Sequence, residues 1–306
     1  MVRHSKGAAL ARMAGVALLA AWTAVPLLGQ DIPINELRPL GPGGTVQIDV
    51  IQHSITIEVW NRNEVEVRGQ YNPAFEQLDI DADAESFSLE IDRRNIRGNG
   101  GGGTLTVRIP AGVELDAESV SGEVRATGNA NSVSLESVSG SVTYAGDSPE
   151  VRLSSVSGSV SYAGTAAEAQ LESVSGSVRL EGNVGALDAE SVSGAVTVIS
   201  GTPVRELDLE TVSGSVTFTG SLAPGGEIAI ESFSGRVEMA LDPATAARFE
   251  LETLSGSISV ALPGVPDDIA RSGRFGPSET ATFVTGNGNG SVEASTLSGS
   301  IVIRAR

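Results

Sequence analysis

The sequence predicts an all-β fold, a single-stranded β-solenoid or β-helix with about 18–21 residues per coil and an irregular β cap at its N-terminal end. Three observations predict it: a Ser-Gly pair recurs nine times, apolar and polar residues alternate around each pair, and helix signals are nearly absent. The recurring glycines are Gly122, Gly140, Gly158, Gly176, Gly194, Gly214, Gly235, Gly256 and Gly299. Their spacings of 18, 18, 18, 18, 20, 21, 21 and 43 residues set the coil length.

Residues 1–30 have the order of a secretory signal peptide. Arg3, Lys6 and Arg12 form a basic start, and an uncharged apolar run follows from Met13 to Gly29. The run is short for a membrane span and no stop-transfer charge cluster follows it, although an uncleaved anchor is the alternative. We therefore expect an exported protein, periplasmic, on the cell surface or extracellular, with no membrane insertion after the signal is removed.

Composition narrows the choice of partner. Removal of the signal takes away three basic residues and leaves 17 arginines against 38 acidic residues, a net charge of 17 − 38 = −21. Nucleic acids and anionic lipid surfaces need basic patches, so neither is expected as a partner. The chain has no cysteine, so disulfides cannot stabilise it and the core and backbone ladders must do so.

The segment before the regular repeats is also expected to be β. After a linker at 31–43, residues 44–110 contain several stretches in which apolar and polar residues alternate, beginning with Val46, Ile48 and Val50. We interpret 44–110 as irregular first coils that cap the solenoid. The whole of 44–306 is expected to form one β-solenoid domain.

The regular repeats at 111–261 contain four apolar columns. In the coil around Gly140 the four members are Leu135, Val138, Val142 and Tyr144, and we expect all four columns to face the interior. The second column consists of Val120, Val138, Val156, Val174, Val192, Val212, Phe233, Leu254 and Leu297. A bend is expected at each Ser-Gly pair, because glycine permits positive φ or a close backbone approach.

The C-terminal part departs from the period. Residues 262–289 are expected to form a surface loop or a degenerate coil, and 290–306 to form the last coil. The best short helix candidate is Pro243 to Arg248, between two repeats.

The recurring S-V-S-G-x-V turns, the opening G-G-T-V-Q-I-D-V…I-T-I-E-V-W and the tail G-N-G-N-G-S-V-E-A-S-T-L-S-G-S-I-V-I resemble the DUF4097 candidate-adhesin family of bacterial β-repeat proteins, also called toastrack domains. The resemblance covers roughly residues 44–306. It implies a β-helix-like stack similar to the head domains of autotransporter adhesins, and some family members accompany envelope-stress systems. It defines no catalytic residues.

The residues themselves indicate no catalytic, cofactor-binding or metal-ligating site. A Ser-His-Asp triad would have to use His53, the one histidine outside the signal segment, and we expect it to be a surface or turn residue. Histidine metal sites need clusters, which this chain lacks. Carbohydrate-cleaving β-helices use acids that interrupt the repeat, whereas the acids here follow it.

One acidic column is unusual. It consists of Glu118, Glu136, Glu172, Glu190, Glu210, Glu231 and Glu252, with Ser154 and Ser295 at the two remaining positions. We expect a solvated face that prevents strand association, with weak divalent-cation binding along the column as the alternative.

The predicted function is that of an exported, non-enzymatic, adhesin-like module that binds an envelope or surface macromolecule, protein or glycan. An envelope-stress sensor or scaffold that binds another envelope protein is the alternative, and a carbohydrate-active β-helix enzyme is the third.

Overall fold

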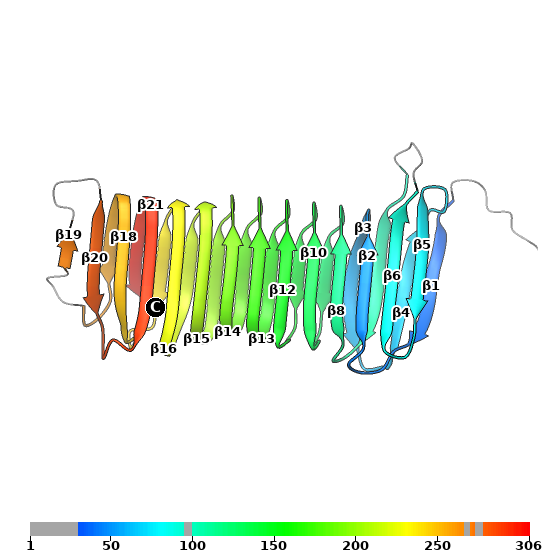
Figure 1. Cartoon of the computed structure of the whole chain (residues 1–306), viewed down its shortest axis with the longest axis horizontal. Coiled ribbons are helices and arrows are strands. Elements are labelled where there is room, and N and C mark those ends of the chain that lie inside the picture. The colour runs from blue at the N-terminus through cyan, green and yellow to red at the C-terminus, as the bar shows by residue number, and fades with distance from the viewer. Residues whose placement is uncertain (1–29, 95–99, 266–269, 273–277) are drawn as a thin grey trace, which may run out of the picture.

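The protein is a long, flat β-solenoid whose axis runs the length of the molecule (Figure 1). The computed structural model describes residues 30–94, 100–265, 270–272 and 278–306. The expected signal peptide therefore lies outside the described residues, apart from Gln30. Within these ranges the regular structure is all strand, and no helix is long and apolar enough to cross a membrane.

The described residues form twenty-one strands. In chain order they are β1 Ile32–Pro39, β2 Thr45–Val50, β3 His53–Trp60, β4 Glu64–Tyr71, β5 Glu76–Ala82, β6 Ser86–Arg93, β7 Gly103–Pro110, β8 Glu114–Ser119, β9 Val124–Thr127, β10 Ser132–Ser137, β11 Val142–Ala145, β12 Glu150–Ser155, β13 Val160–Ser173, β14 Val178–Ser191, β15 Val196–Ser213, β16 Val216–Ser234, β17 Val237–Leu241, β18 Ala247–Ala261, β19 Ala270–Ser272, β20 Glu279–Val284 and β21 Gly290–Ala305.

Hydrogen bonds join the described strands into one continuous sheet, folded so that each regular coil contributes one strand segment to each of two parallel layers, here called sheets. The segment before the Ser-Gly turn, such as β10, pairs in register with β8 and β12, so Leu135 lies between Ala117 and Leu153. The segment after the turn, such as β11, pairs with β9 and β13. We call the first the acidic sheet, because it presents the Glu column, and the second the serine-threonine sheet. Strands β13 to β16 run from one sheet into the other around the corner opposite the Ser-Gly turn.

The order of coils in space differs from their order in the chain at both ends. At the C-terminal end, β21 lies between β16–β17 and β18, although it follows β18 in sequence (Figure 1). At the N-terminal end, β2 lies between β6 and β8, and β3 lies between β7 and β9. At each end, therefore, the coil that is nearest the chain terminus in sequence is not the outermost coil in space. β18 lies outside β21, and β6 and β7 lie outside β2 and β3.

Antiparallel strands cover both ends of the stack. β5 pairs with β6, and β4 pairs with both β7 and β1, at the N-terminal end. At the C-terminal end β20 pairs with β18, and β19 pairs with β20. Residues 262–289 therefore include a cap strand that runs antiparallel to the coils. Residues 290–306 include β21, which is last in sequence but is enclosed in space.

The interior consists of stacked aliphatic side chains from both sheets, with few rings. The third column from Val124 to Ile301 is almost fully buried, and Tyr144 stacks on Tyr162 with ring centroids 5.5 Å apart. Burial raises the pKa of Tyr144 to about 12. The expected helix at Pro243–Arg248 is wrong: these residues form a turn that leads directly into β18.

Candidate functional site

The second apolar column lies on the surface, which corrects the expectation that it faces the interior. Its nine side chains are between 38% and 59% exposed, and Phe233 is the most exposed. The reason is the alternation of the strand: Val120 lies two residues after Glu118 and three after Ala117, so it shares the outward phase of the glutamate. We call this row of side chains the apolar column.

The apolar column and the Glu column run side by side along the corner of the solenoid and enclose a shallow groove. The groove has a volume of about 680 Å³ and crosses seven successive coils, from Ser154–Val156 to Glu252–Leu254. With coils about 4.8 Å apart, this corresponds to a length of about 29 Å. Its lining includes five glutamates and no basic residue among the described positions.

The floor of the groove is a ladder of buried hydroxyls. The ladder begins before the groove: Ser137 donates its Oγ–H to the carbonyl of Gly122 in the preceding coil at 2.9 Å, and its Oγ accepts the N–H of Gly140 at 2.8 Å. Ser155, Ser173 and Ser191 repeat this bridge. The turn is therefore held by the serine three residues before the glycine, such as Ser137 before Gly140. The serine of the Ser-Gly pair, Ser139 in this coil, does not make this bridge.

The turn glycines are needed for a close approach between coils. A Cβ placed on Gly140 would lie 1.9 Å from the carbonyl oxygen of Gly122, and one on Gly158 would lie 2.0 Å from that of Gly140. None of the nine has a positive φ. Of the two reasons expected for glycine at this bend, the structure selects the close approach.

The hydroxyl ladder is interrupted near the C-terminal end of the groove. The hydroxyls of Ser232 and Thr296 are buried and have no hydrogen-bond partner, whereas Thr253 in the next coil bonds the carbonyl of Gly299 at 3.1 Å. Here the N–H of Gly235 bonds the carbonyl of Ser298. An unpaired buried hydroxyl costs about 1–3 kcal/mol, so two adjacent coils carry unsatisfied polar groups beneath the groove.

The same two coils carry the bulkiest part of the apolar column. Because β21 is enclosed, the order in space is Val212, Phe233, Leu297, Leu254. Across the groove, Ser295 lies between Glu231 and Glu252, so the Glu column has a neutral gap here. A second hollow of about 400 Å³ on the acidic sheet adjoins the groove at these three residues and extends to β20.

The electrostatics of the acidic sheet favour protonation. The pKa of Glu118, Glu190 and Glu210 in the Glu column is raised, mainly by partial burial and to a lesser extent by repulsion from neighbouring carboxylates. The same causes raise the pKa of Asp188 and Asp208 in the adjacent outward column. No three described acidic or histidine side chains converge as a metal site would require, so the Glu column is a line of charges and not a cluster.

His53 is not a surface residue, which corrects the sequence expectation. It is completely buried at the start of β3, with Nε2 3.1 Å from the carbonyl oxygen of Gln70 and Nδ1 3.7 Å from Oε1 of Glu76. Glu76 is also buried and accepts the N–H groups of Asn72 and Gly102. The nearest serine hydroxyl contact, from Ser119, goes to the main-chain carbonyl of His53 and not to its ring. The described residues therefore form a buried His-Glu pair in the N-terminal cap and no nucleophile–base pair around this ring.

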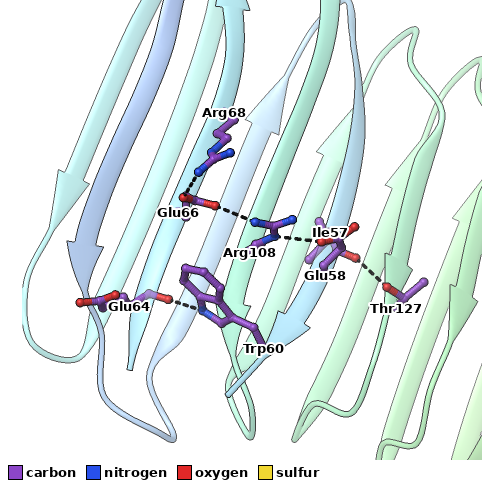
Figure 2. A network of polar contacts seen from close by, with 8 residues as sticks. All are labelled: Ile57, Glu58, Trp60, Glu64, Glu66, Arg68, Arg108 and Thr127. Carbon is purple, nitrogen blue, oxygen red and sulfur yellow. Dashed lines mark hydrogen bonds and ion pairs between the residues drawn. The ribbon is translucent and has the colours of Figure 1, made fainter. Parts of the chain in front are cut away.

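A second polar cluster lies on the serine-threonine sheet at the N-terminal end (Figure 2). Glu66 on β4 accepts hydrogen bonds from Arg68 at 2.6 Å and from Arg108 on β7 at 3.1 Å, and Arg108 also bonds Glu58 on β3 at 2.9 Å. The guanidinium of Arg108 lies 5.9 Å from the ring centroid of Trp60. Arg108 joins β7 to both β4 and β3 through these contacts, so we assign the cluster a structural role in the cap.

The sequence that forms this architecture matches a known protein family. The family model described as Toastrack DUF4097 matches residues 45–304. The chain belongs to the Toastrack DUF4097 family. The family match covers the cap coils, the regular repeats and β21, so the groove and both interleaved ends lie within the Toastrack region. No curated protein matches the chain.

Solved structures with similarity to this Toastrack chain include three bacterial proteins. A candidate adhesin from Bacteroides fragilis is 13% identical, with a TM-score of 0.39 over 89% of this chain and 97% of that one. A candidate adhesin from Parabacteroides merdae is 11% identical, with a TM-score of 0.43 over 68% and 90%. One from Parabacteroides distasonis is 10% identical, with a TM-score of 0.42 over 89% and 97%.

Proposed function

We propose that this protein is an exported, non-enzymatic, adhesin-like module of the cell envelope, and that it binds a surface macromolecule along the groove between the apolar column and the Glu column. The observation that carries the proposal is the exposure of nine aliphatic or aromatic side chains in one continuous row. Soluble proteins rarely expose long contiguous apolar stripes unless these contact a partner.

The chemistry of the groove supports binding in preference to turnover. Its residues repeat from coil to coil, so each coil offers a similar weak contact and the contacts add along the length of the partner. Hydrolysis of a glycan would need two carboxylates with different environments placed around one bond, whereas the five glutamates of the groove recur at the same position of the coil.

The test compares groove variants with a matched control. Val174→Ser, Val192→Ser and Phe233→Ser combined remove three members of the apolar column, while Leu37→Ser on β1 removes an equally exposed side chain outside the groove. The exported chain is tested for binding to isolated envelope fractions and for release of sugar reducing ends. We expect the triple variant to lose binding with an unchanged melting temperature, and Leu37→Ser to retain binding. Retained binding by the triple variant, or catalytic release of sugar, would overturn the proposal.

A further inference from the structure

We infer that the partner segment bound by this groove is an extended polypeptide in which basic and apolar residues alternate, and that its main anchor is the coil pair carrying Phe233 and Leu297. This inference rests on the proposed function, because it names the chemical class of what the groove binds. It is carried by the width of the groove, by its charge, and by the exposed Phe233 and Leu297 beside the gap in the Glu column.

The width selects an extended chain. The two walls are formed by residues two positions apart on the same strand, such as Glu231 and Phe233, so they are separated by roughly 6.6 Å. An α-helix with its side chains is about 10–12 Å across and would lie above the walls instead of between them. An extended strand places successive side chains on opposite sides, so it can direct one set to each wall. About nine residues would cover the groove.

The charge selects a basic partner. One wall carries five glutamates, the described lining has no arginine or lysine, and the whole chain carries a formal charge of −18. A second copy of this chain would bring the same glutamates against the groove, so self-association through this face is disfavoured. A basic side chain next to the Glu column relieves the repulsion between its carboxylates, while apolar side chains on the other edge contact the apolar column.

The C-terminal end of the groove combines a gap between two carboxylates with two large exposed apolar side chains. Glu231 and Glu252 lie on either side of the neutral Ser295, about 9.6 Å apart over two coil spacings, which leaves room for one basic side chain between two carboxylates. Opposite them lie Phe233, which is 59% exposed, and Leu297. Beneath lie the buried hydroxyls of Ser232 and Thr296, which have no hydrogen-bond partner. Aromatic side chains are enriched at the centres of protein interfaces, where a few residues provide most of the binding energy.

The experiment uses the exported chain and a labelled peptide of about nine residues with alternating lysine and leucine, kept below the concentration at which it self-associates. Fluorescence anisotropy measures its Kd at low and high salt. Comparison peptides alternate glutamate with leucine or lysine with serine, and a fourth has the lysine-leucine composition in two blocks. We expect the alternating lysine-leucine peptide to bind at least about tenfold more tightly than each of the others, with weaker binding at high salt.

The variants locate the site. Phe233→Ser should weaken binding at least about tenfold, and Glu231→Gln with Glu252→Gln should weaken it and reduce its salt dependence. The controls Leu37→Ser and Glu168→Gln, the latter on the acidic sheet outside the groove lining, should leave the Kd unchanged. Equal binding of the glutamate-leucine or block peptide, or equal losses in the controls, would overturn the inference. If the apolar-column triple variant loses envelope binding but no lysine-leucine peptide binds, the proposed function stands and the basic partner is wrong.

Discussion

Gly158→Ala tests the turn geometry most directly. The added Cβ would lie 2.0 Å from the carbonyl oxygen and 2.4 Å from the carbonyl carbon of Gly140, both backbone atoms of the preceding coil. To reach an ordinary contact above 3.0 Å, the two backbones must separate locally by about an ångström, because Cβ is fixed to the backbone and no side-chain rotation moves it.

That movement would break the hydroxyl bridge at this coil. Ser155 donates to the carbonyl of the half-buried Gly140 at 2.8 Å and accepts the N–H of the buried Gly158 at 2.8 Å. Two lost hydrogen bonds with their backbone groups left unpaired correspond to about 2–6 kcal/mol of unfolding free energy. Gly112→Ala is the control: Gly112 has a φ of +73° and nothing within 4 Å of a Cβ, so only backbone strain of about 1–2 kcal/mol is expected.

The assay is urea unfolding followed by circular dichroism, with the midpoint and the slope fitted separately. We expect Gly158→Ala to shift the midpoint several times further than Gly112→Ala, at similar slope. If Gly158→Ala costs no more than Gly112→Ala, the coils are not in contact at this turn and the account of the glycine repeat is wrong.

The remaining predictions use the same unfolding assay or thermal melts. Ser155→Ala should cost about 2–6 kcal/mol because it unpairs the same two backbone groups, whereas the exposed Ser157→Ala should change stability by less than about 0.5 kcal/mol. Val178→Asp should prevent folding because it buries an unpaired charge, and Val174→Asp should fold because its side chain is 45% exposed. The melting temperature should rise between pH 7 and about pH 5, because carboxyl pKa values raised in the folded state let it bind more protons than the unfolded chain; a flat profile would contradict this. Sodium chloride should raise the melting temperature, and millimolar Ca²⁺ should raise it only slightly more at equal ionic strength; saturation at micromolar Ca²⁺ would instead reveal a dedicated site.

The sequence was sufficient to predict the architecture, because the Ser-Gly period and the alternation of apolar residues report directly on coil length and on strand phase. The same alternation also predicts which side chains of each coil face outward into the groove and which face the interior. Val138 is in phase with Glu136 and out of phase with Leu135, and Ser137 is in phase with Leu135. Recurrence of an aliphatic residue in every coil predicts burial, whereas the phase of the strand predicts exposure for Val138 and burial for Ser137. The structure follows the phase, which the expectation of four inward-facing columns did not include.

His53 shows a different limit of the sequence. Its partner Glu76 lies 23 residues away on β5, and the ring is enclosed only when the β4–β7 region folds over the first coil. No local pattern signals that pairing, because both residues lie in the irregular cap where the repeat gives no register. The regular coils were predictable because each coil packs on the coil that precedes it in sequence. The cap was not predictable, since its residues pair with partners that are distant in sequence.

The interleaved ends follow from the repeat itself. Identical columns make the coils nearly interchangeable as neighbours, so the period cannot specify which coil lies outermost. The edge that lies outermost is covered: β18 continues through β19 into β20, which returns antiparallel along the acidic-sheet segment of β18. Enclosing β21 gives it two parallel neighbours and leaves the outer position to the coil with a cap strand. The enclosure also places Leu297 beside Phe233 and Ser295 between Glu231 and Glu252. The part of the groove with the largest apolar side chains and the gap in the Glu column therefore exists only because the last coil in the chain is not the last coil in the stack.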